Sequence, residues 1–461
     1  MSGAGETRTG YDRATAVPRP RPRAHPGAGT HGDDAFGTHT VHDEAFADAA
    51  LFAALERELP AAVRLRRELH AEPRVSGDEG DTLDRLLAAL PPDAVVERLP
   101  GHAAVARIGP PGPAVALRAE LDALPLAEET GLPWAARNGA MHACGHDVHM
   151  AAVAALARAM AVARPRVPVV VVCQPREETY PSGAFDVLAS AALERHDVRT
   201  VLGAHVQPTL PTGSVACTAG VVNASADEFT VTMSGVPGHA AYPHLNRDPV
   251  LAASQFVVSA QQIVSRNADP MLPAVLTVGS IDAGSTANAT PADVVVRGTL
   301  RSMDAGQRTM LSARVAEIAD GIALAHGCRA RTEISVGEPA LVNDPGLAGA
   351  TAGRLAGAGV QVVRDLRSCG ADDFAYFCQA HTGLMLFVGT GPGGEQAPRL
   401  HSSTFAPPDG AVRDVAMALA HSLLSAMTPP SHTPEPVPEP VPEPEPEPGA
   451  GAVPGRDPEP D

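Results

Sequence analysis

The sequence is short of cysteine, of long apolar runs and of basic residues. Its six cysteines are scattered over 461 residues, at spacings that resemble no disulfide framework. No apolar run is long enough to cross a membrane, and the N-terminus lacks the apolar core of a signal peptide. These shortages predict a cytoplasmic protein with reduced thiols.

Acidic residues outnumber basic ones, and the excess is unevenly distributed. The formal net charge is −18, of which residues 429–461 contribute −7 from eight acidic residues and one arginine. The remaining charge of −11 belongs to residues 1–428, which are therefore mildly acidic. This argues against nucleic acid as a partner. A small-molecule substrate stays possible, because a small molecule senses only the local field.

Composition and periodicity divide the chain into two tails and two folded parts. Residues 1–42 are rich in Gly, Pro and Arg, and residues 429–461 form a Pro-Glu repeat, so both tails are predicted to be disordered. Residues 43–224 and 338–428 alternate helical and strand patterns, which predicts one discontinuous α/β domain. Residues 225–337 show the order strand-helix-strand-strand-helix-strand, which predicts a smaller inserted α+β domain.

The densest cluster of chemically active residues is MHACGHDVHM at residues 141–150. Cys144 and His146 stand two residues apart, so in extended or loop backbone their side chains lie on one side. Thiolate and neutral imidazole are the usual ligands of a borderline divalent ion such as zinc. The alternative is a buried free cysteine beside incidental histidines. Because two ligands do not make a site, the rest of the chain must supply the others.

Carboxylates follow two predicted apolar strands. Asp122 comes after a strand at residues 114–121, and Glu177 and Glu178 come after a Val-rich strand at residues 167–173. Adjacent buried carboxylates are costly unless ions or donors compensate them, which suggests one metal ligand and one general base. On this evidence Asp122 is equally consistent with a solvated loop acid.

His205 follows a third predicted strand, at residues 200–204. A single histidine in such a place is more often a core residue whose ring nitrogens are hydrogen-bonded than a metal ligand. Because two other strand ends already carry ligand-type residues, we interpret His205 as a ligand.

Eight motifs occur along the chain in this order: LRAELDALP, MHACGHD, QPREE, GAHVQP, GHAAYPH, STANATPAD, CGADDFAYF and LHSS. This ordered set resembles a known family, the metal-dependent amidohydrolases and peptidases that include the aminoacylases. Within that family the chain is most similar to the hippurate hydrolase and indoleacetyl-amino-acid hydrolase branch. The resemblance covers about residues 56–427.

The resemblance implies a doubly wound α/β metallohydrolase domain with a smaller lid domain, residues 225–337, that pairs two subunits into a homodimer. It also implies two divalent metal ions per subunit: Mn, Zn, Co or Ni. The implied ligand positions are Cys144, His146, Glu178, His205 and His401.

The resemblance also implies roles for four further residues. Glu177 is implied as the general base, and Asp122 as the carboxylate that orients the site from beneath the metals. His239 is implied as the lid histidine that polarises the scissile carbonyl, often across a dimer interface. Asn288 is implied as a lid residue that binds the substrate.

Three positions depart from the family pattern. Glu120 stands where the branch usually has Asp, and Arg74 stands where an acidic residue usually follows the proline. Residues 179–182 read TYPS instead of the usual glycine run. None is an implied ligand, but the third changes the wall beside the carboxylate pair and predicts an unusual substrate preference.

The sequence thus predicts a hydrolase of linear amide C–N bonds that cleaves a small-molecule N-acyl amino acid into a carboxylate and a free amino acid. Neither nucleic acid nor a membrane is expected as a partner. One alternative is a dipeptidase or carboxypeptidase of the same family. Another is a catalytically silent dimeric binding protein, which the filled ligand positions argue against.

Overall fold

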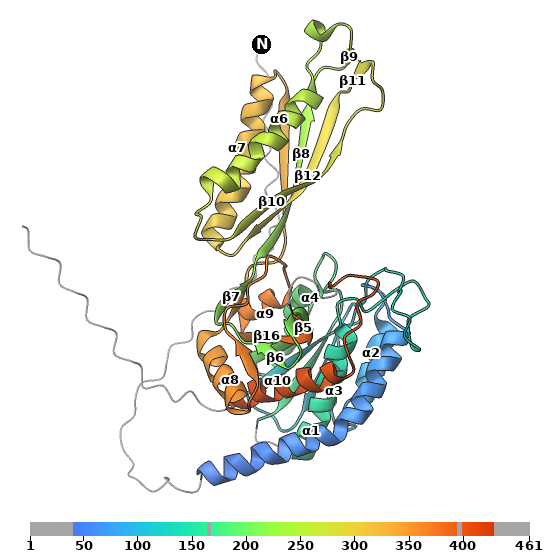
Figure 1. Cartoon of the computed structure of the whole chain (residues 1–461), viewed down its shortest axis with the longest axis vertical. Helices are drawn as coiled ribbons and strands as arrows, with labels where there is room; N and C mark the ends of the chain where they lie inside the picture. The colour runs from blue at the N-terminus through green and yellow to red at the C-terminus, as the bar shows by residue number, and fades with distance from the viewer. Residues whose placement is uncertain (1–39, 164–166, 394–398, 428–461) are drawn as a thin grey trace, which may run out of the picture. The chain divides into compact units, whose positions relative to one another are not determined.

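The computed structural model describes residues 40–163, 167–393 and 399–427 (Figure 1). The Pro-Glu tail and almost all of the predicted N-terminal tail lie outside these residues. Helix α1 begins at Thr40, three residues inside the predicted tail. Within the described residues, no helix combines the length and the apolarity needed to cross a bilayer.

An eight-stranded sheet forms the larger part of the fold, with the strand order β1-β2-β4-β3-β5-β16-β6-β15. Its four central strands, β4, β3, β5 and β16, are parallel, and β1, β2 and β6 add antiparallel pairings. The bounds are β1 Val95–Arg98, β2 Ala104–Ile108, β3 Ala114–Glu120, β4 Val169–Gln174, β5 Val198–Pro211, β6 Ser214–Ala216, β15 Gln361–Val363 and β16 Thr382–Gly391.

Helices cover both faces of this sheet. One buried cluster joins it to α1, α2, α3, α8 and α10, and a second joins it to α4, α5 and α9. The bounds are α1 Thr40–Ala71, α2 Gly80–Ala89, α3 His146–Ala163, α4 Gly183–Ala189, α5 Ala192–Arg195, α8 Pro345–Gly357, α9 Phe374–Ala380 and α10 Gly410–Met427. The predicted doubly wound α/β class is confirmed.

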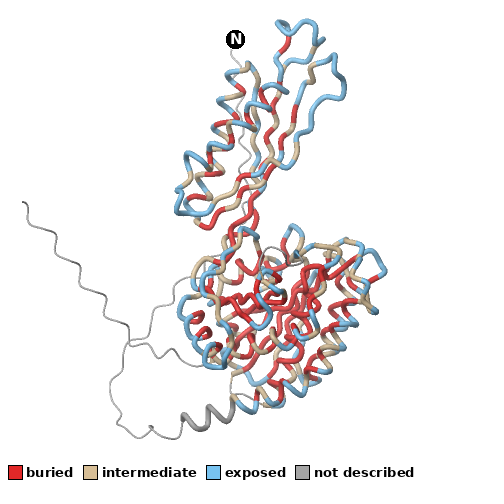
Figure 2. The backbone as a smooth tube through the Cα atoms, viewed as in Figure 1, coloured by how far each residue is buried: buried red, intermediate tan, exposed pale blue. Residues whose placement is uncertain are grey.

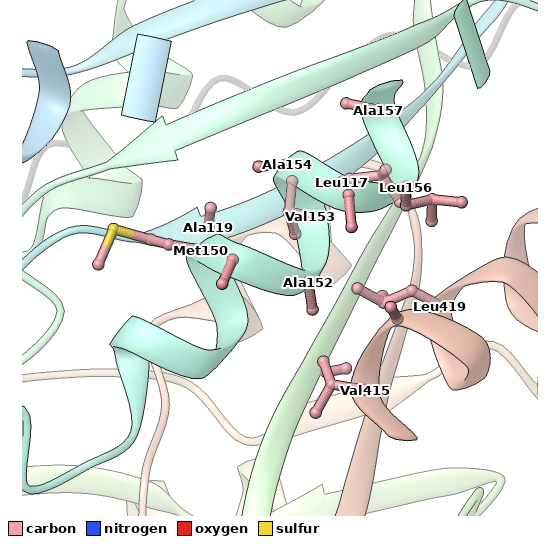
Figure 3. Packing of buried hydrophobic residues seen from close by; sticks show 14 of the residues in the cluster. Leu117, Ala119, Met150, Ala152, Val153, Ala154, Leu156, Ala157, Val415 and Leu419 are labelled. Carbon is pink, nitrogen blue, oxygen red and sulfur yellow. The ribbon is translucent and has the colours of Figure 1, made fainter. Parts of the chain in front are cut away.

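Helix α3 is buried along most of its length, as Figure 2 shows for this part of the fold. Its many alanines let it lie close to both the sheet and α10. Val153 and Leu156 share one apolar cluster with Leu117 of β3 and Leu419 of α10 (Figure 3). Burying such side chains stabilises the fold by about 1.5 to 3 kcal/mol each. The start of α3, which carries candidate ligands, is therefore fixed to a rigid core.

The winding of the chain creates a switch point beside β3. The chain passes from β3 through α3 to β4 on one side, and then through α4 and α5 to β5 on the other side. In open α/β sheets, ligands bind outside the carboxyl ends of the strands at such a point. The crevice beyond β3, β4 and β5 is therefore the expected place for a site.

A second, antiparallel sheet has the strand order β10-β12-β8-β13 and packs against α6 and α7 (Figure 1). This is the predicted order of elements in an α+β unit, although the domain boundaries themselves stay a prediction. The bounds are β8 Ser225–Ser234, α6 Pro249–Gln262, β10 Ala274–Asp282, β12 Asp293–Ser302, α7 Ala305–Ala325 and β13 Arg329–Val336. Two small ribbons pair β9 Gly238–His239 with β11 Ala289–Thr290, and β7 Gly220–Asn223 with β14 Leu341–Asn343.

The sequence prediction was wrong about the extent of β5. A strand ending at Ala204 was expected, but β5 continues to Pro211. His205 therefore lies within a strand, where it pairs in register with Phe387 of β16. It still faces the candidate site, as its contacts show below.

Candidate metal centre

Two overlapping groups of ligand-type side chains lie at the switch point. The ligand atoms of Cys144, His146 and His205 lie within 4.8 Å of one another, and so do those of Cys144, Glu178 and His401. Cys144 belongs to both groups. The structure therefore brings all five predicted ligand positions together, from segments far apart in the chain.

Cys144 and His205 contact each other directly in the first group. Cys144 Sγ lies 3.3 Å from His205 Nε2, and His205 Nδ1 lies 2.7 Å from the backbone oxygen of Val206. Donation from Nδ1 to that carbonyl leaves Nε2 as the lone-pair nitrogen facing the sulfur. Burial and then His149 lower the pKa of His205 to about 3, so its imidazole is neutral, the form that binds metals.

His401 reaches the second group from a strained turn. Its φ of +62° is unusual for a residue with a side chain, and its backbone N–H donates to the Ala143 carbonyl at 2.9 Å. This places His401 Nε2 3.2 Å from Glu178 Oε1. Strained backbone of this kind clusters at functional sites.

Asp122 lies next to two candidate ligands, and the role beneath the metals that the resemblance implies for it stays a prediction. His146 Nδ1 lies 2.9 Å from the Asp122 carbonyl oxygen, which directs Nε2 toward the ligand cluster. Asp122 Oδ2 accepts hydrogen bonds from the Glu178 backbone N–H at 3.0 Å and from Ser76 Oγ at 2.7 Å. Asp122 thus contacts two candidate ligands, His146 through its backbone carbonyl and Glu178 through its carboxylate.

Glu177 lies beside the groups with its carboxylate turned toward His146. Its Oε2 is 3.7 Å from His146 Nε2. Burial, then Glu178 and Asp372, raise the pKa of Glu177 well above its usual range. A carboxyl group with a raised pKa next to a ligand cluster is suited to proton transfer.

The donor set fits divalent cations. Burial and Glu178 raise the pKa of the Cys144 thiol well above its usual range, and only a cation beside it would favour the thiolate. His146 Nε2 is buried and has no hydrogen-bond partner among the described residues. One sulfur, three imidazoles and one carboxylate favour borderline metals over magnesium or calcium.

Sequence reasoning missed a buried charged network behind the carboxylates. Arg118, at the centre of the apolar strand β3, donates to Glu120 Oε1 at 2.5 Å and to Asp373 Oδ1 at 2.6 Å. It also lies 3.1 Å from Asp372. A charged residue in the middle of an otherwise apolar strand was the available signal. Its acidic partners, Asp372 and Asp373, stand in the motif CGADDFAYF, to which no role in the site was assigned from the sequence.

Glu120, one of the departures from the family pattern, belongs to this network. Its Oε1 lies 3.3 Å from His149 Nδ1, and His149 Nε2 accepts the backbone N–H of Val206 at 2.9 Å. Glu120 therefore helps to place β5 beside the site. Of the other departures, Arg74 pairs with Asp81, and Tyr180 donates from its hydroxyl to Glu338.

The two predicted lid residues lie together but outside the ligand groups. His239 is on β9, Asn288 immediately precedes β11, and the Asn288 carbonyl accepts the backbone N–H of Ala240 at 3.0 Å. Both side chains are exposed. Their predicted roles toward the substrate stay predictions.

Comparisons with known proteins place the chain in a family. A family model described as Peptidase family M20/M25/M40 matches residues 116–424. The chain is 36% identical over 343 residues to N-acetyl-L-cysteine deacetylase of Bacillus subtilis, covering 73% of this chain and 81% of that enzyme. It is 33% identical over 319 residues to N-acetyldiaminopimelate deacetylase of Shouchella clausii, covering 68% and 83%. A crystal structure from Bacillus subtilis, described as a dinuclear metal-binding peptidase from the M20 family, is similar at a TM-score of 0.70 and 28% identity, covering 80% of this chain and 99% of that one.

Proposed function

Because the chain belongs to peptidase family M20/M25/M40 and is a hydrolase of amide bonds, we propose that it cleaves N-acyl amino acids with the help of two divalent metal ions. The observation that carries the proposal is the convergence of five ligand-type side chains in two groups that share Cys144. Glu177 lies beside these groups, 3.7 Å from His146 Nε2, and the proposal assigns it to proton transfer.

In this proposal Cys144, His146, Glu178, His205 and His401 hold the ions. Bound divalent ions would lower the pKa of water to ~7 and polarise the scissile carbonyl.

The remaining steps belong to residues of the chain itself. Glu177 would take the proton of the attacking water and give it to the leaving amine. Asp122 would keep His146 and Glu178 in position through its two hydrogen bonds. His239 would stabilise the developing oxyanion, where one donor is worth roughly 3 to 4 kcal/mol of barrier. Asn288 would bind the substrate beside it.

The names of the relatives support an acyl-amino-acid substrate. Two of them are deacetylases of N-acetylated amino acids. The sequence resemblance points instead to the branch with benzoyl and indoleacetyl groups. Tyr180, exposed two residues after Glu178, supports a substrate wall that differs from the glycine-lined one of that branch.

We extend the proposal to a homodimer through a lid formed by residues 225–337. No strand of the four-stranded sheet pairs with the eight-stranded sheet in the described part of the chain, which supports a separate lid. Strand β10 lies at the edge of its sheet, where backbone groups are available to a partner.

A substrate panel tests the proposal. Metal-free protein is reconstituted with manganese, zinc, cobalt or nickel and assayed with acetyl-, benzoyl- and indoleacetyl-amino acids, and with dipeptides for comparison. We expect two equivalents of metal and hydrolysis of acyl-amino acids in preference to dipeptides. Preference for dipeptides would support the dipeptidase alternative. A protein that binds no divalent ion and shows no metal-stimulated hydrolysis would support the silent binding protein.

A further inference from the structure

A buried arginine of helix α1 lies behind the ligand groups. Arg66 is fully buried, and each of its three guanidinium nitrogens has a different partner. Nε donates to Asp147 Oδ2 at 3.0 Å, Nη1 donates to Asp409 Oδ1 at 3.0 Å, and Nη2 donates to the Pro407 carbonyl at 2.7 Å. The planar, rigid guanidinium fixes these partners relative to one another.

The partners of Arg66 lie on two segments that carry candidate ligands. Asp147 directly follows His146 in the first turn of α3. Asp409 closes the segment that begins at His401 and leads into α10. Arg66 contacts neither His146 nor His401 directly, but it links the two segments that carry them.

A second contact route connects the same segments. His70, one turn further along α1, lies 3.0 Å from Asp147 Oδ2 through Nδ1 and 3.2 Å from Glu128 Oε1 through Nε2. The neighbouring Glu129 donates its backbone N–H to the Ser403 carbonyl at 2.8 Å and accepts from Ser403 Oγ at 2.6 Å. The loop that carries Glu128 and Glu129 therefore also contacts the His401 segment, through Ser403.

We propose that Arg66 is a positioning residue that preforms the metal centre by fixing the His401 segment to the start of α3. The inference rests on the proposed metal binding. His401 is the most exposed of the candidate ligands and sits in a strained turn, so it depends on support from outside. Groups that orient metal ligands from behind typically contribute 10- to 100-fold to metal affinity.

The test compares three variants of the full-length, metal-free protein. Asp409→Asn weakens the link between Arg66 and the His401 segment at a partly exposed position. Arg66→Met removes the whole connection. Arg67→Met is the matched control, because Arg67 contacts Asp409 from the surface and has no contact with Asp147.

Metal affinity and spectroscopy are the measurements. Manganese affinity is measured by competition with a chromophoric chelator. Cobalt binding is followed through the charge-transfer absorption band between the Cys144 thiolate and the cobalt ion. We expect Asp409→Asn and Arg66→Met to weaken binding of one of the two ions by about 10- to 100-fold. Arg67→Met should bind both ions as the parent does. Circular dichroism and the melting temperature of each metal-free variant establish that it is folded.

The outcomes separate this inference from the proposed function. A purely structural role would lower the melting temperature and leave both affinities unchanged, and this result in folded Asp409→Asn would overturn the inference alone. If Arg66→Met does not fold, Asp409→Asn decides. If the parent protein binds no divalent ion, the proposed function fails and the positioning role fails with it.

Discussion

Replacing Glu177 with glutamine tests the proposed general base most directly. The change keeps the size of the side chain and removes its ability to accept a proton. General bases contribute typically 10²- to 10⁴-fold, so kcat should fall by that factor, equivalent to about 2.7 to 5.4 kcal/mol of barrier. Glu177 belongs to neither group that contains Cys144, so the variant should still bind two equivalents of metal.

The same variant should be more stable than the parent when both are free of metal. Burial and the neighbouring carboxylates Glu178 and Asp372 raise the pKa of Glu177 in the folded protein. Because the folded pKa lies above the unfolded one, the ionised side chain destabilises the fold at neutral pH. Glutamine removes this penalty, so the melting temperature should rise. The difference should shrink as the pH falls through the raised pKa and vanish near the unfolded pKa of ~4.3.

The assay combines initial rates, metal content and thermal melting of the metal-free protein. Glu317→Gln is the control, because it makes the same chemical change on an exposed residue of α7 that pairs with Arg314, away from both ligand groups. It should leave kcat and metal content unchanged. A Glu177→Gln variant that turns over at the parent rate with full metal content would refute the assigned role. An unchanged melting temperature would refute the electrostatic argument.

Three further predictions concern the scaffold. Leu117→Ala, in the buried centre of β3, should lower the free energy of unfolding by about 2 to 5 kcal/mol in urea titrations; a loss under 1 kcal/mol would contradict the packing described here. Asn343→Ala should cost about 3 kcal/mol in the same measurement, because it leaves the Met385 N–H and two buried carbonyls without their partner, at about 1 kcal/mol or more each. Gly145→Ala should lose bound metal while circular dichroism stays unchanged, because its φ is +86° and a Cβ would lie 2.4 Å from Val206 Cγ2; normal metal content would show that the turn tolerates a side chain.

Local sequence patterns were sufficient to predict most of the scaffold. The Val-rich run at residues 167–173 became the buried strand β4, Val169–Gln174. The end of β5 was predicted too early, because the strand was expected to stop at Ala204 and continues through Pro208 to Pro211. In the structure, the ladder between β5 and β16 shifts register between Gly389 and Gly391, where missing N–H groups are tolerated.

Cys144, His146, Glu178 and His205 stand at recognisable places in the chain, and the family resemblance implied His401, but the residues that support these five gave no such signal. Arg118 and Asp373 are 255 residues apart, so nothing local reveals that they pair. Arg66 and His70 look like polar positions on an amphipathic helix, yet both are buried. Only the packing of α1 against the start of α3 shows that both side chains contact Asp147. Buried polar residues of this kind depend on tertiary contacts that no periodicity encodes.

The parallel pairing of β5 with β16 has a consequence for biosynthesis. Between these two strands the chain builds the entire four-stranded sheet and then β14, α8, β15 and α9. While a ribosome makes this long interval, the apolar edge of β5 has no neighbour on that side. Nascent chains with such an uncovered edge are prone to misassembly and attract chaperones. The nascent chain is therefore most prone to misassembly while residues 225–337 are being synthesised. Pairing of β16 with β5 then covers the exposed edge.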